Sequence, residues 1–226
     1  MSSSISVVIP TLNEASCLGD TLRRLRAQRP HEILVADGGS TDATCAIACD
    51  ADRVLHAPRG RAAQMNHAVA VASGDLLLFL HADCAIEEGA LAEAEAILRR
   101  RDVAAGCLRM TVTTSGWVFR LIDACATARV RLTGLIYGDQ GLFVRRELFE
   151  RLGGFPPLRF MEDVFLSRLL RRVGRMVVAA KRIFVSPRRW EHAGIVRQTL
   201  RNWTLTALAS AGVHPDRLAA FYPVVR

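Results

Sequence analysis

Hydrophobic residues in the first hundred positions gather in short runs that alternate with longer stretches of helical spacing. Residues 5–10 (ISVVIP) are apolar and β-branched, and leucines at 18, 22 and 25 follow with the spacing of an amphipathic helix. The same alternation predicts further strands at 32–36, 53–56 and 76–80, and further helices that end near residues 49, 72 and 101. Repeated strand and helix alternation favours a parallel sheet with right-handed crossovers.

The pattern is more mixed after residue 101. It predicts strands at 103–113, 142–144 and 176–185, and helices at 117–132, 162–173 and from 195 to about 211. No internal repeat or low-complexity linker divides the chain. The predicted fold class is therefore α/β in a single domain, with a mostly parallel central sheet flanked by helices and a mixed second half.

Composition narrows the class of protein further. Half of the 226 residues are hydrophobic, which predicts a globular domain with a sizeable core. No apolar run approaches the roughly 20 residues that a membrane-spanning helix needs, so any membrane contact is expected to be peripheral. The six cysteines show no C-x-x-C spacing, which favours reduced thiols in a cytoplasmic protein.

The net charge of +8 favours anionic partners, which include nucleotide phosphates, an anionic membrane surface and nucleic acid. Nucleic acid is the least favoured of these, because only 6% of the residues are aromatic and none form a stacking platform among the arginines. The sequence therefore predicts a phosphate-bearing small molecule and no nucleic-acid partner.

Three of the predicted strands end in residues that could border a ligand site. They are Pro10-Thr11, Asp37 and the pair His81 and Asp83, and the carboxyl ends of parallel strands meet at one edge of a sheet, where ligands bind. Asp83, near the end of the stretch DLLLFLHADC, is a hard oxygen ligand suited to Mg²⁺ or Mn²⁺. Ser40 or Thr41 is expected to cap the helix after Asp37.

Five blocks of the chain together resemble the family 2 glycosyltransferases of the GT-A fold. They are VVIPTLNEA, ILVADGGSTDAT, ASGDLLLFLHADC, GLFVRRELFERLGGF and MEDVFLSRLL, which occur in that family's order over residues 5 to about 175. HADC, YGDQG and SPRRWEH look most like the small bacterial arsenosugar-biosynthesis-like branch. The resemblance implies a nucleotide-binding half at 1–100 and an acceptor-binding half at 101–226 that includes the C-terminal helix.

The resemblance also implies a UDP- or GDP-sugar donor and residues that would hold it. Pro10, Thr11 and Glu14 would line the nucleotide pocket, and Asp37 would contact the uracil or ribose. Arg61 and Asn66 would help to position the donor. Arg61 also stands at a predicted helix start, where free amide groups and a guanidinium can both meet a phosphate. Alternatively, Asp37 is an ordinary turn residue and Arg61 is a solvated surface arginine.

A divalent metal, Mg²⁺ or Mn²⁺, is implied at the strand-end motif. Asp83 matches the second acid of the family's D-x-D element, whereas His81 stands where many members have the first acid. A histidine can bind the donor ribose or a metal but adds no second negative charge. His192 could complete the metal shell, or it is an ordinary surface residue.

The later motifs imply the catalytic groups. Asp163, with Glu162 before it, matches the family's proposed general base, although both acids would also complement a helix N-terminus. The remaining candidates face the acceptor or the diphosphate, with an ordinary turn and solvated arginines as alternatives, and are Asp139, Gln140, Arg188 and Arg189.

The expected function is inverting, metal-dependent transfer of a sugar from a nucleotide-diphosphate donor to a hydroxylated small-molecule or lipid acceptor. Two alternatives remain open. A sugar-phosphate nucleotidyltransferase is disfavoured because residues 10–15 read PTLNEA and lack a glycine-rich phosphate loop. A catalytically silent nucleotide-sugar-binding protein is compatible with the missing first acid. The sugar, the acceptor and the oligomeric state are left open.

Overall fold

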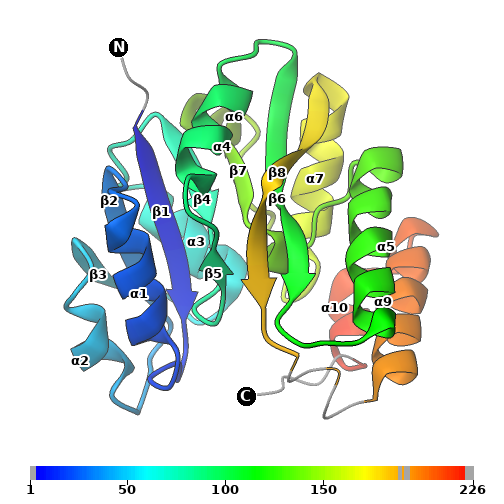
Figure 1. Cartoon of the computed structure of the whole chain (residues 1–226), viewed down its shortest axis with the longest axis horizontal. Helices are drawn as coiled ribbons and strands as arrows, with labels where there is room; N and C mark the ends of the chain where they lie inside the picture. The colour runs from blue at the N-terminus through cyan, green and yellow to red at the C-terminus, as the bar shows by residue number, and fades with distance from the viewer. Residues whose placement is uncertain (1–3, 188–189, 191–193, 222–226) are drawn as a thin grey trace.

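The computed structural model describes residues 4–187, 190 and 194–221. Its centre is an eight-stranded sheet with the strand order β3-β2-β1-β4-β7-β6-β8-β5 (Figure 1). The first four strands in this order are parallel neighbours. They are β1 (Ile5–Thr11), β2 (Glu32–Asp37), β3 (Arg53–His56) and β4 (Leu76–Phe79).

The other half of the sheet is mixed. Strand β7 (Leu142–Arg145) runs antiparallel to both β4 and β6 (Val103–Val112), and β8 (Arg175–Val185) is parallel to β6. The two-residue strand β5 (Ala85–Ile86) pairs antiparallel with β8 at the edge of the sheet. The predicted α/β class with a mostly parallel sheet and a mixed second half is confirmed.

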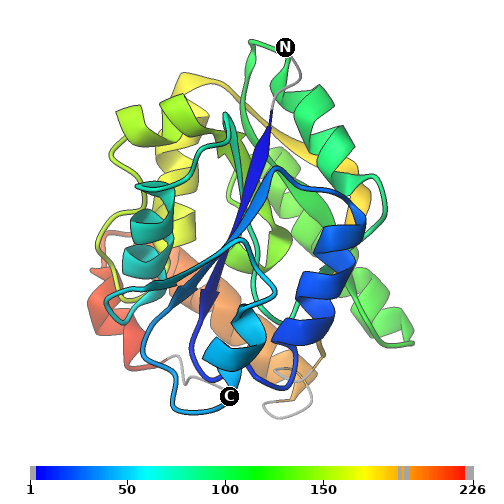
Figure 2. The ribbon, with the colours of Figure 1, turned by 90° about the vertical axis from the view of Figure 1, so that its left-hand side faces the viewer.

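Helices cover both faces of this sheet, as the two perpendicular views show (Figures 1 and 2). One face carries α1 (Leu18–Ala27), α2 (Thr44–Ala48), α4 (Ala90–Leu98) and α5 (Trp117–Thr133). The other face carries α3 (Arg61–Val69), α6 (Arg146–Arg151) and α7 (Glu162–Val173). Helices α9 (Ile195–Ser210) and α10 (Pro215–Ala219) pack on the start of α7 in a third cluster.

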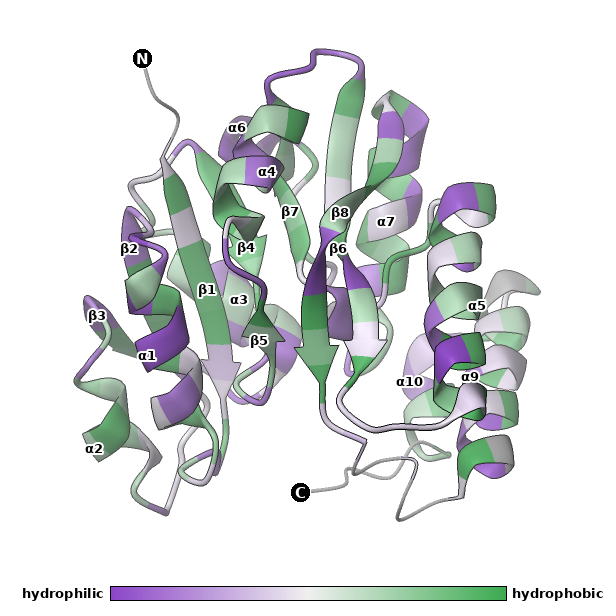
Figure 3. Ribbon diagram, in the orientation of Figure 1, coloured by the Kyte–Doolittle hydropathy of each residue, from purple (hydrophilic) through white to green (hydrophobic). Residues whose placement is uncertain are grey.

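The central strands are apolar along their whole length because both of their faces are buried. On β1, Val7 and Ile9 belong to one core cluster and Val8 to the other. On β4, Leu78 and Leu77 divide between the two clusters in the same way. Figure 3 shows this layer of hydrophobic strands between helices of mixed colour. A strand that is buried on both sides is typical of a parallel sheet covered by helices.

Two local predictions were wrong. The stretch 87–101 was expected to be one helix, but α4 begins only at Ala90, because the Glu87 carboxylate instead accepts hydrogen bonds from the backbone and side chain of Arg182. Neither Ser40 nor Thr41 caps α2: the hydroxyl of Ser40 bonds to Asp37 and that of Thr41 to Asn13, and it is Asp42 that accepts the Thr44 amide at the start of the helix. Strand β5 and helix α10 were not predicted.

Among the helices of the described ranges, none is long and apolar enough to cross a bilayer.

Gly106 on β6 provides a test of how tightly the sheet packs. A Cβ atom there would lie 2.4 Å from the ring of the buried Phe143 and 2.7 Å from the carbonyl oxygen of Val177. We expect Gly106→Ala to lower the free energy of unfolding by about 3 kcal/mol, because neither a fully buried ring nor a strand backbone can move aside. Denaturant titration followed by circular dichroism measures the change.

Gly19→Ala is the matched control. Gly19 lies within α1, and a Cβ atom there would meet only Ile47, at an ordinary contact distance of 3.5 Å. This variant should gain about 0.5–1 kcal/mol from the higher helix propensity of alanine. Equal effects of the two substitutions would show that the contact with Phe143 does not limit the packing.

Candidate active site

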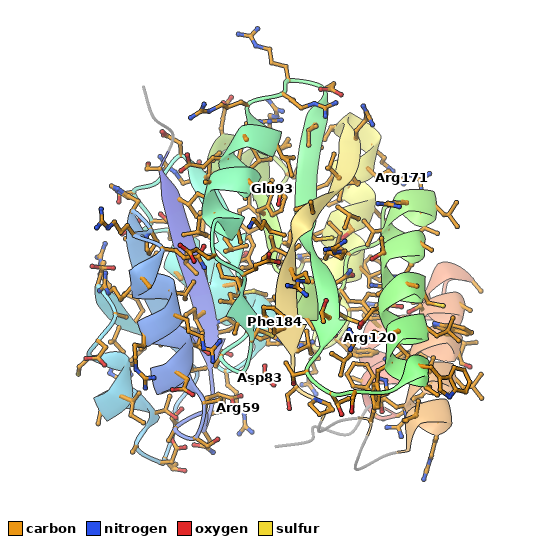
Figure 4. The ribbon with its side chains drawn as sticks, viewed as in Figure 1. Arg59, Asp83, Glu93, Arg120, Arg171 and Phe184 are labelled. Atoms are coloured by element: carbon orange, nitrogen blue, oxygen red, sulfur yellow. The ribbon has the colours of Figure 1, made fainter. Side chains whose placement is uncertain are left out.

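The carboxyl ends of the parallel strands meet at one edge of the molecule, the lower edge in Figure 1. There Thr11 and Asp37, the last residues of β1 and β2, are register partners. Figure 4 places Asp83 at the same edge, below Phe184, with Arg59 close to the end of β1. The strand ends that the sequence singled out therefore do gather at one edge of the sheet.

Asp37 is held by four hydrogen bonds. Its carboxylate accepts the hydroxyls of Thr11 at 3.2 Å and Ser40 at 2.5 Å, and the amides of Gly39 and Ser40, both at 2.9 Å. Burial alone would raise the pKa of Asp37, but these hydrogen bonds outweigh it and the pKa lies below its ordinary value. Asp37 is therefore an ionised, buried group that shapes the turn after β2. Its contact with a nucleoside stays a prediction.

The loops after β1 and β2 lock onto each other. The amide of Asn13 donates to the hydroxyl of Ser40 at 2.9 Å, and the Asn13 side chain accepts the amide of Thr41 at 2.8 Å. The amide of Glu14 donates to the hydroxyl of Thr44 at 2.8 Å, and the Glu14 side chain is half-buried. Pro10 and Thr11 are both buried, and their contact with a nucleotide stays a prediction.

Gln64 on α3 is a site residue that the sequence analysis missed. Its amide nitrogen donates to the carbonyl oxygens of Thr11 at 2.7 Å and Ala36 at 2.8 Å, and its oxygen accepts the amide of Gly60 at 3.3 Å. The side chain is almost completely buried. Gln64 thus connects the ends of β1 and β2 to the turn that presents Arg61, the first residue of α3. The signal in the sequence was a glutamine among the apolar positions of a helix.

Asn66 has a structural environment. Its side-chain amide donates to the carbonyl oxygen of Phe155 at 2.8 Å and accepts the amide of the same residue at 2.9 Å. Gly154 lies so close that a Cβ atom there would fall 2.7 Å from the Asn66 oxygen. Asn66 therefore joins α3 to the loop before α7, and its part in donor positioning stays a prediction.

Behind this edge, Arg61 and Glu162 form an ion pair, with Nε and Oε1 2.9 Å apart. The Glu162 side chain is only 3% exposed, and its other oxygen, Oε2, has no hydrogen-bond partner among the described residues. Asp163 follows it in the first turn of α7 and accepts the amides of Gly138 and, at 2.7 Å, of Val164. Two carboxylates are therefore buried side by side.

The pKa of Asp163 is raised to about 6. Burial is the main cause, and the neighbouring Glu162 adds to it because two negative charges repel each other. Arg61 and the amides of Gly138 and Val164 partly offset the rise. A carboxylate with this pKa is ionised at neutral pH and yet is a stronger base than an ordinary aspartate.

A pocket of about 60 Å³ opens beside Asp163. Its walls come from α3, the end of β4, the turn Gly138–Gln140, the start of α7 and helix α9. The polar side chains that line it are Arg61, His81, Tyr137, Asp139, Asp163, Asn202 and Thr206. The pocket therefore joins predicted donor, catalytic and acceptor residues from both halves of the chain.

Gly138 is where His81 and Asp163 come together. A Cβ atom on this glycine would lie 2.9 Å from Nε2 of His81 and 3.2 Å from Oδ2 of Asp163. The absence of a side chain at Gly138 thus lets an imidazole, a backbone amide and a carboxylate share one wall of the pocket. The structure places His81 beside the candidate base.

Asp83 lies in a different opening. It lines a cleft of about 450 Å³ with α1, Cys84 and Phe184, and its side chain is exposed. The separation has a local cause: β4 ends at Phe79, and a turn closed by the hydrogen bond from the Cys84 amide to the His81 carbonyl, 3.2 Å long, turns the chain between positions 81 and 83.

The described residues contain no group of three His, Cys, Asp or Glu side chains that could hold a metal ion. Asp83 is an exposed carboxylate at the mouth of the sheet and fits a hard divalent cation, but the remaining ligands would have to be oxygens of the diphosphate and water. His192, the other predicted metal ligand, lies outside the described residues, as do Arg188 and Arg189.

Asp139 and Gln140 face different ways. Asp139 lines the pocket, whereas Gln140 is fully buried, with its oxygen accepting the guanidinium of Arg129 and, at 3.2 Å, the amide of Tyr137. Gln140 therefore holds the turn from within and only Asp139 can meet a ligand directly. The Tyr137 hydroxyl is 2.6 Å from that of Thr206, which ties the turn to α9.

The N-terminus of α7 has a strained backbone. Met161 precedes the helix with φ 63°, in the left-handed region that residues other than glycine rarely adopt. It is held there because its side chain is buried against Leu205, Ala209 and Leu218 of α9 and α10. The two C-terminal helices thus hold Glu162 and Asp163 in place.

Solved structures of similar fold come from glycosyltransferases. S. aureus TarS 1-349 superposes with a TM-score of 0.64 at 22% identity, over 81% of this chain and 61% of that one. The mannosyltransferase PcManGT from Pyrobaculum calidifontis, in complex with GDP-Man and Mn²⁺, also gives a TM-score of 0.64, at 24% identity over 79% of this chain and 56% of that one. At such identities the likeness shows the fold, which is that of the GT-A class.

In sequence, the chain is 27% identical over 169 residues to the glycosyltransferase AglE of Haloferax volcanii, which covers 67% of this chain and 56% of AglE. The chain thus spans little more than half the length of these relatives. The family model described as glycosyl transferase family 2 matches residues 6–153, which include β1 to β4, Arg61, His81 and Asp83. The chain belongs to glycosyl transferase family 2.

Proposed function

We propose that this protein transfers a sugar, with inversion, from a nucleoside-diphosphate donor to a hydroxylated acceptor with the help of Mg²⁺ or Mn²⁺. The observation that carries the proposal is Asp163, a buried carboxylate with a pKa of about 6 on the wall of a pocket at the carboxyl edge of the sheet. Structures of similar fold contain UDP-GlcNAc in one case and GDP-Man with Mn²⁺ in another. Whether the donor carries uridine or guanosine stays open.

The donor would lie across the edge between the two openings. Its nucleoside would rest on the turn that Asp37 shapes, and its diphosphate would lie near Asp83, Arg59 and Arg61. A divalent cation held by Asp83 would supply positive charge for the leaving diphosphate. Arg61 pairs with Glu162 in the structure, and the diphosphate would compete with Glu162 for it. A donor that draws Arg61 away would leave Asp163 more basic.

Asp163 would accept the proton from the acceptor hydroxyl as that oxygen bonds to the anomeric carbon. The bond from this carbon to the diphosphate oxygen breaks in the same step, and its electron pair leaves with the nucleoside diphosphate. A single in-line displacement inverts the anomeric configuration. Asp139, Asn202 and Tyr137 line the same pocket and would orient the acceptor. His81, beside Gly138, would help to place the sugar ring.

The two rival functions differ in product. A nucleotidyltransferase would release pyrophosphate from a nucleoside triphosphate and a sugar phosphate, and a silent binding protein would release nothing. The loop after Thr11 disfavours the nucleotidyltransferase, because residues 12–15 read LNEA and lack a glycine-rich phosphate-binding sequence. Incubation with Mn²⁺ and a panel of nucleotide sugars, followed by assay of UDP, GDP and pyrophosphate, separates all three.

Substitution of Asp163 tests its role as base. We expect Asp163→Asn to lower kcat by at least about 100-fold while the Kd for the nucleotide sugar changes little, because the proton acceptor is lost and the diphosphate contacts remain. Release of nucleoside diphosphate measures kcat and calorimetry measures Kd. Retention of full activity would overturn the assignment.

Substitution of Asp83 tests the metal site. Asp83→Ala should weaken donor binding about tenfold or more in the presence of Mn²⁺ and should leave the weaker metal-free binding unchanged. Asp75→Ala is the matched control, because Asp75 is an exposed carboxylate directly before β4, at the end of the strand opposite to the carboxyl edge. The same loss in both variants would rule out a specific metal site at Asp83.

The raised pKa of Asp163 predicts two pH effects. Activity should fall about tenfold per pH unit below about pH 6, because protonated Asp163 accepts no proton. Stability should change in the opposite sense. The folded protein binds the Asp163 proton more tightly than the unfolded chain does, so the free energy of unfolding should fall as the pH rises from about 4 to about 6.

Asp163→Asn isolates this group. The wild type should lose stability relative to the variant over that pH range, as measured by urea unfolding at several pH values, and the difference should level off above the folded pKa. A pH-independent difference between the two proteins would show that the pKa of Asp163 is not raised by folding.

A further inference from the structure

Six of the eight large hydrophobic side chains that are exposed among the described residues lie on two helices, α5 and α9. Trp117 is 78% exposed and Trp203 52%. Both helices lie at the end of the molecule opposite β3, on the right in Figure 1, and Figure 2 shows them both on the far side. We call this set the α5/α9 surface: Trp117, Leu121, Leu132, Leu200, Trp203 and Leu208.

On each helix these side chains lie on the half that faces solvent. Trp117, Leu121 and Leu132 lie within about 60° of one another around the axis of α5, given 3.6 residues per turn. On α9 the exposed apolar positions recur at 200, 203, 207 and 208, while the buried Leu205 and Ala209 face α7 and α10. Each helix therefore has an apolar stripe toward solvent as well as the one that it buries.

The charges beside these stripes are almost all positive. The sequences of α5 and α9 contain five arginines and one acid, and Arg129 is the arginine that points inward, to Tyr137 and Gln140. The single acid, Asp123, is largely buried and paired with Arg120 at 2.8 Å, and Figure 4 shows Arg120 beside α5. Arg131 and Arg197 are exposed. An apolar stripe with two tryptophans and a basic border is the pattern of a helix that lies in a membrane interface.

The α5/α9 surface is also connected to the pocket. The ring of Tyr137 lies under the guanidinium of Arg129 from α5, 3.3 Å from the ring centroid, and its hydroxyl bonds to Thr206 of α9. Asn202 and Thr206, which line the pocket, belong to the same helix as the exposed Trp203. One helix thus faces the candidate acceptor site on one side and solvent, through apolar side chains, on another.

We propose that the α5/α9 surface binds the face of an anionic lipid bilayer and brings the pocket to lipid-borne acceptors. The binding itself needs no nucleotide sugar; the choice of acceptor rests on the proposed transfer activity. A second copy of the chain fits this surface less well, because a symmetric contact would place the arginines of both copies opposite each other. Bilayer headgroups supply negative charge, and the adjoining acyl region accepts the tryptophans.

Vesicle binding of the full chain, without donor, tests the proposal. The protein should sediment with vesicles of phosphatidylcholine mixed with phosphatidylglycerol, less with pure phosphatidylcholine, and less as salt increases. Arg131→Gln together with Arg197→Gln should reduce binding about fivefold for each arginine. Trp117→Ser together with Trp203→Ser should reduce it at least about tenfold.

Matched controls lie elsewhere on the surface. Val173→Ser removes a side chain that is 51% exposed at the end of α7, and Arg99→Gln removes an exposed charge after α4; neither should change binding. Tryptophan fluorescence gives a second measurement, because the third tryptophan, Trp190, is buried. The emission should shift to shorter wavelength on binding, and the shift should vanish in the tryptophan double variant.

Three results would overturn the proposal. The first is no binding to anionic vesicles at low salt. The second is equal binding by the variants with substitutions in the α5/α9 surface and by the control variants. The third is a dimer of the protein that Trp203→Ser dissociates. Failure of the transfer reaction with soluble acceptors would leave vesicle binding intact, so the two proposals are tested separately.

Discussion

Two carboxylates buried next to each other are unstable unless other groups compensate them, and the site is built around this requirement at Glu162 and Asp163. The compensation comes from three parts of the chain: the Arg61 guanidinium at the start of α3, the Gly138 amide in the turn before β7, and the first turn of α7 itself. Each part faces the edge where the parallel strands end. These contacts do not fully offset burial and the repulsion from Glu162, and the pKa of Asp163 is therefore raised, which is the property a base needs at neutral pH.

The periodicity of the sequence was sufficient for the main architecture because the core strands are buried on both faces and the helices on one. The two patterns differ clearly over residues such as 76–80 and 18–25. Strand β5 could not be predicted in this way, since its two residues are set by pairing with β8, which lies about a hundred positions away. The late start of α4 has the same origin: Glu87 makes its bonds with Arg182 across the sheet and not within a helix.

The arrangement of the site residues was harder to predict from the sequence than the fold. Motifs located Asp83, Arg61 and Asp163, but they did not show that His81 and Asp83 line separate openings. An extended strand would have pointed positions 81 and 83 the same way, and only the turn closed by Cys84 separates them. Gln64 was overlooked for a related reason. The carbonyl groups that it satisfies belong to two strands that are remote from it in sequence.

The C-terminal helices connect these observations. Met161, with its left-handed backbone, is buried against α9 and α10, and the same α9 contributes Asn202 and Thr206 to the pocket. Helix α9 thus packs against the first turn of α7, where Arg61 pairs with one of the two carboxylates. The family match ends at residue 153, before Asp163 and before either of these helices. The part of the chain that packs around Glu162 and Asp163 thus lies outside the residues that the family model matches.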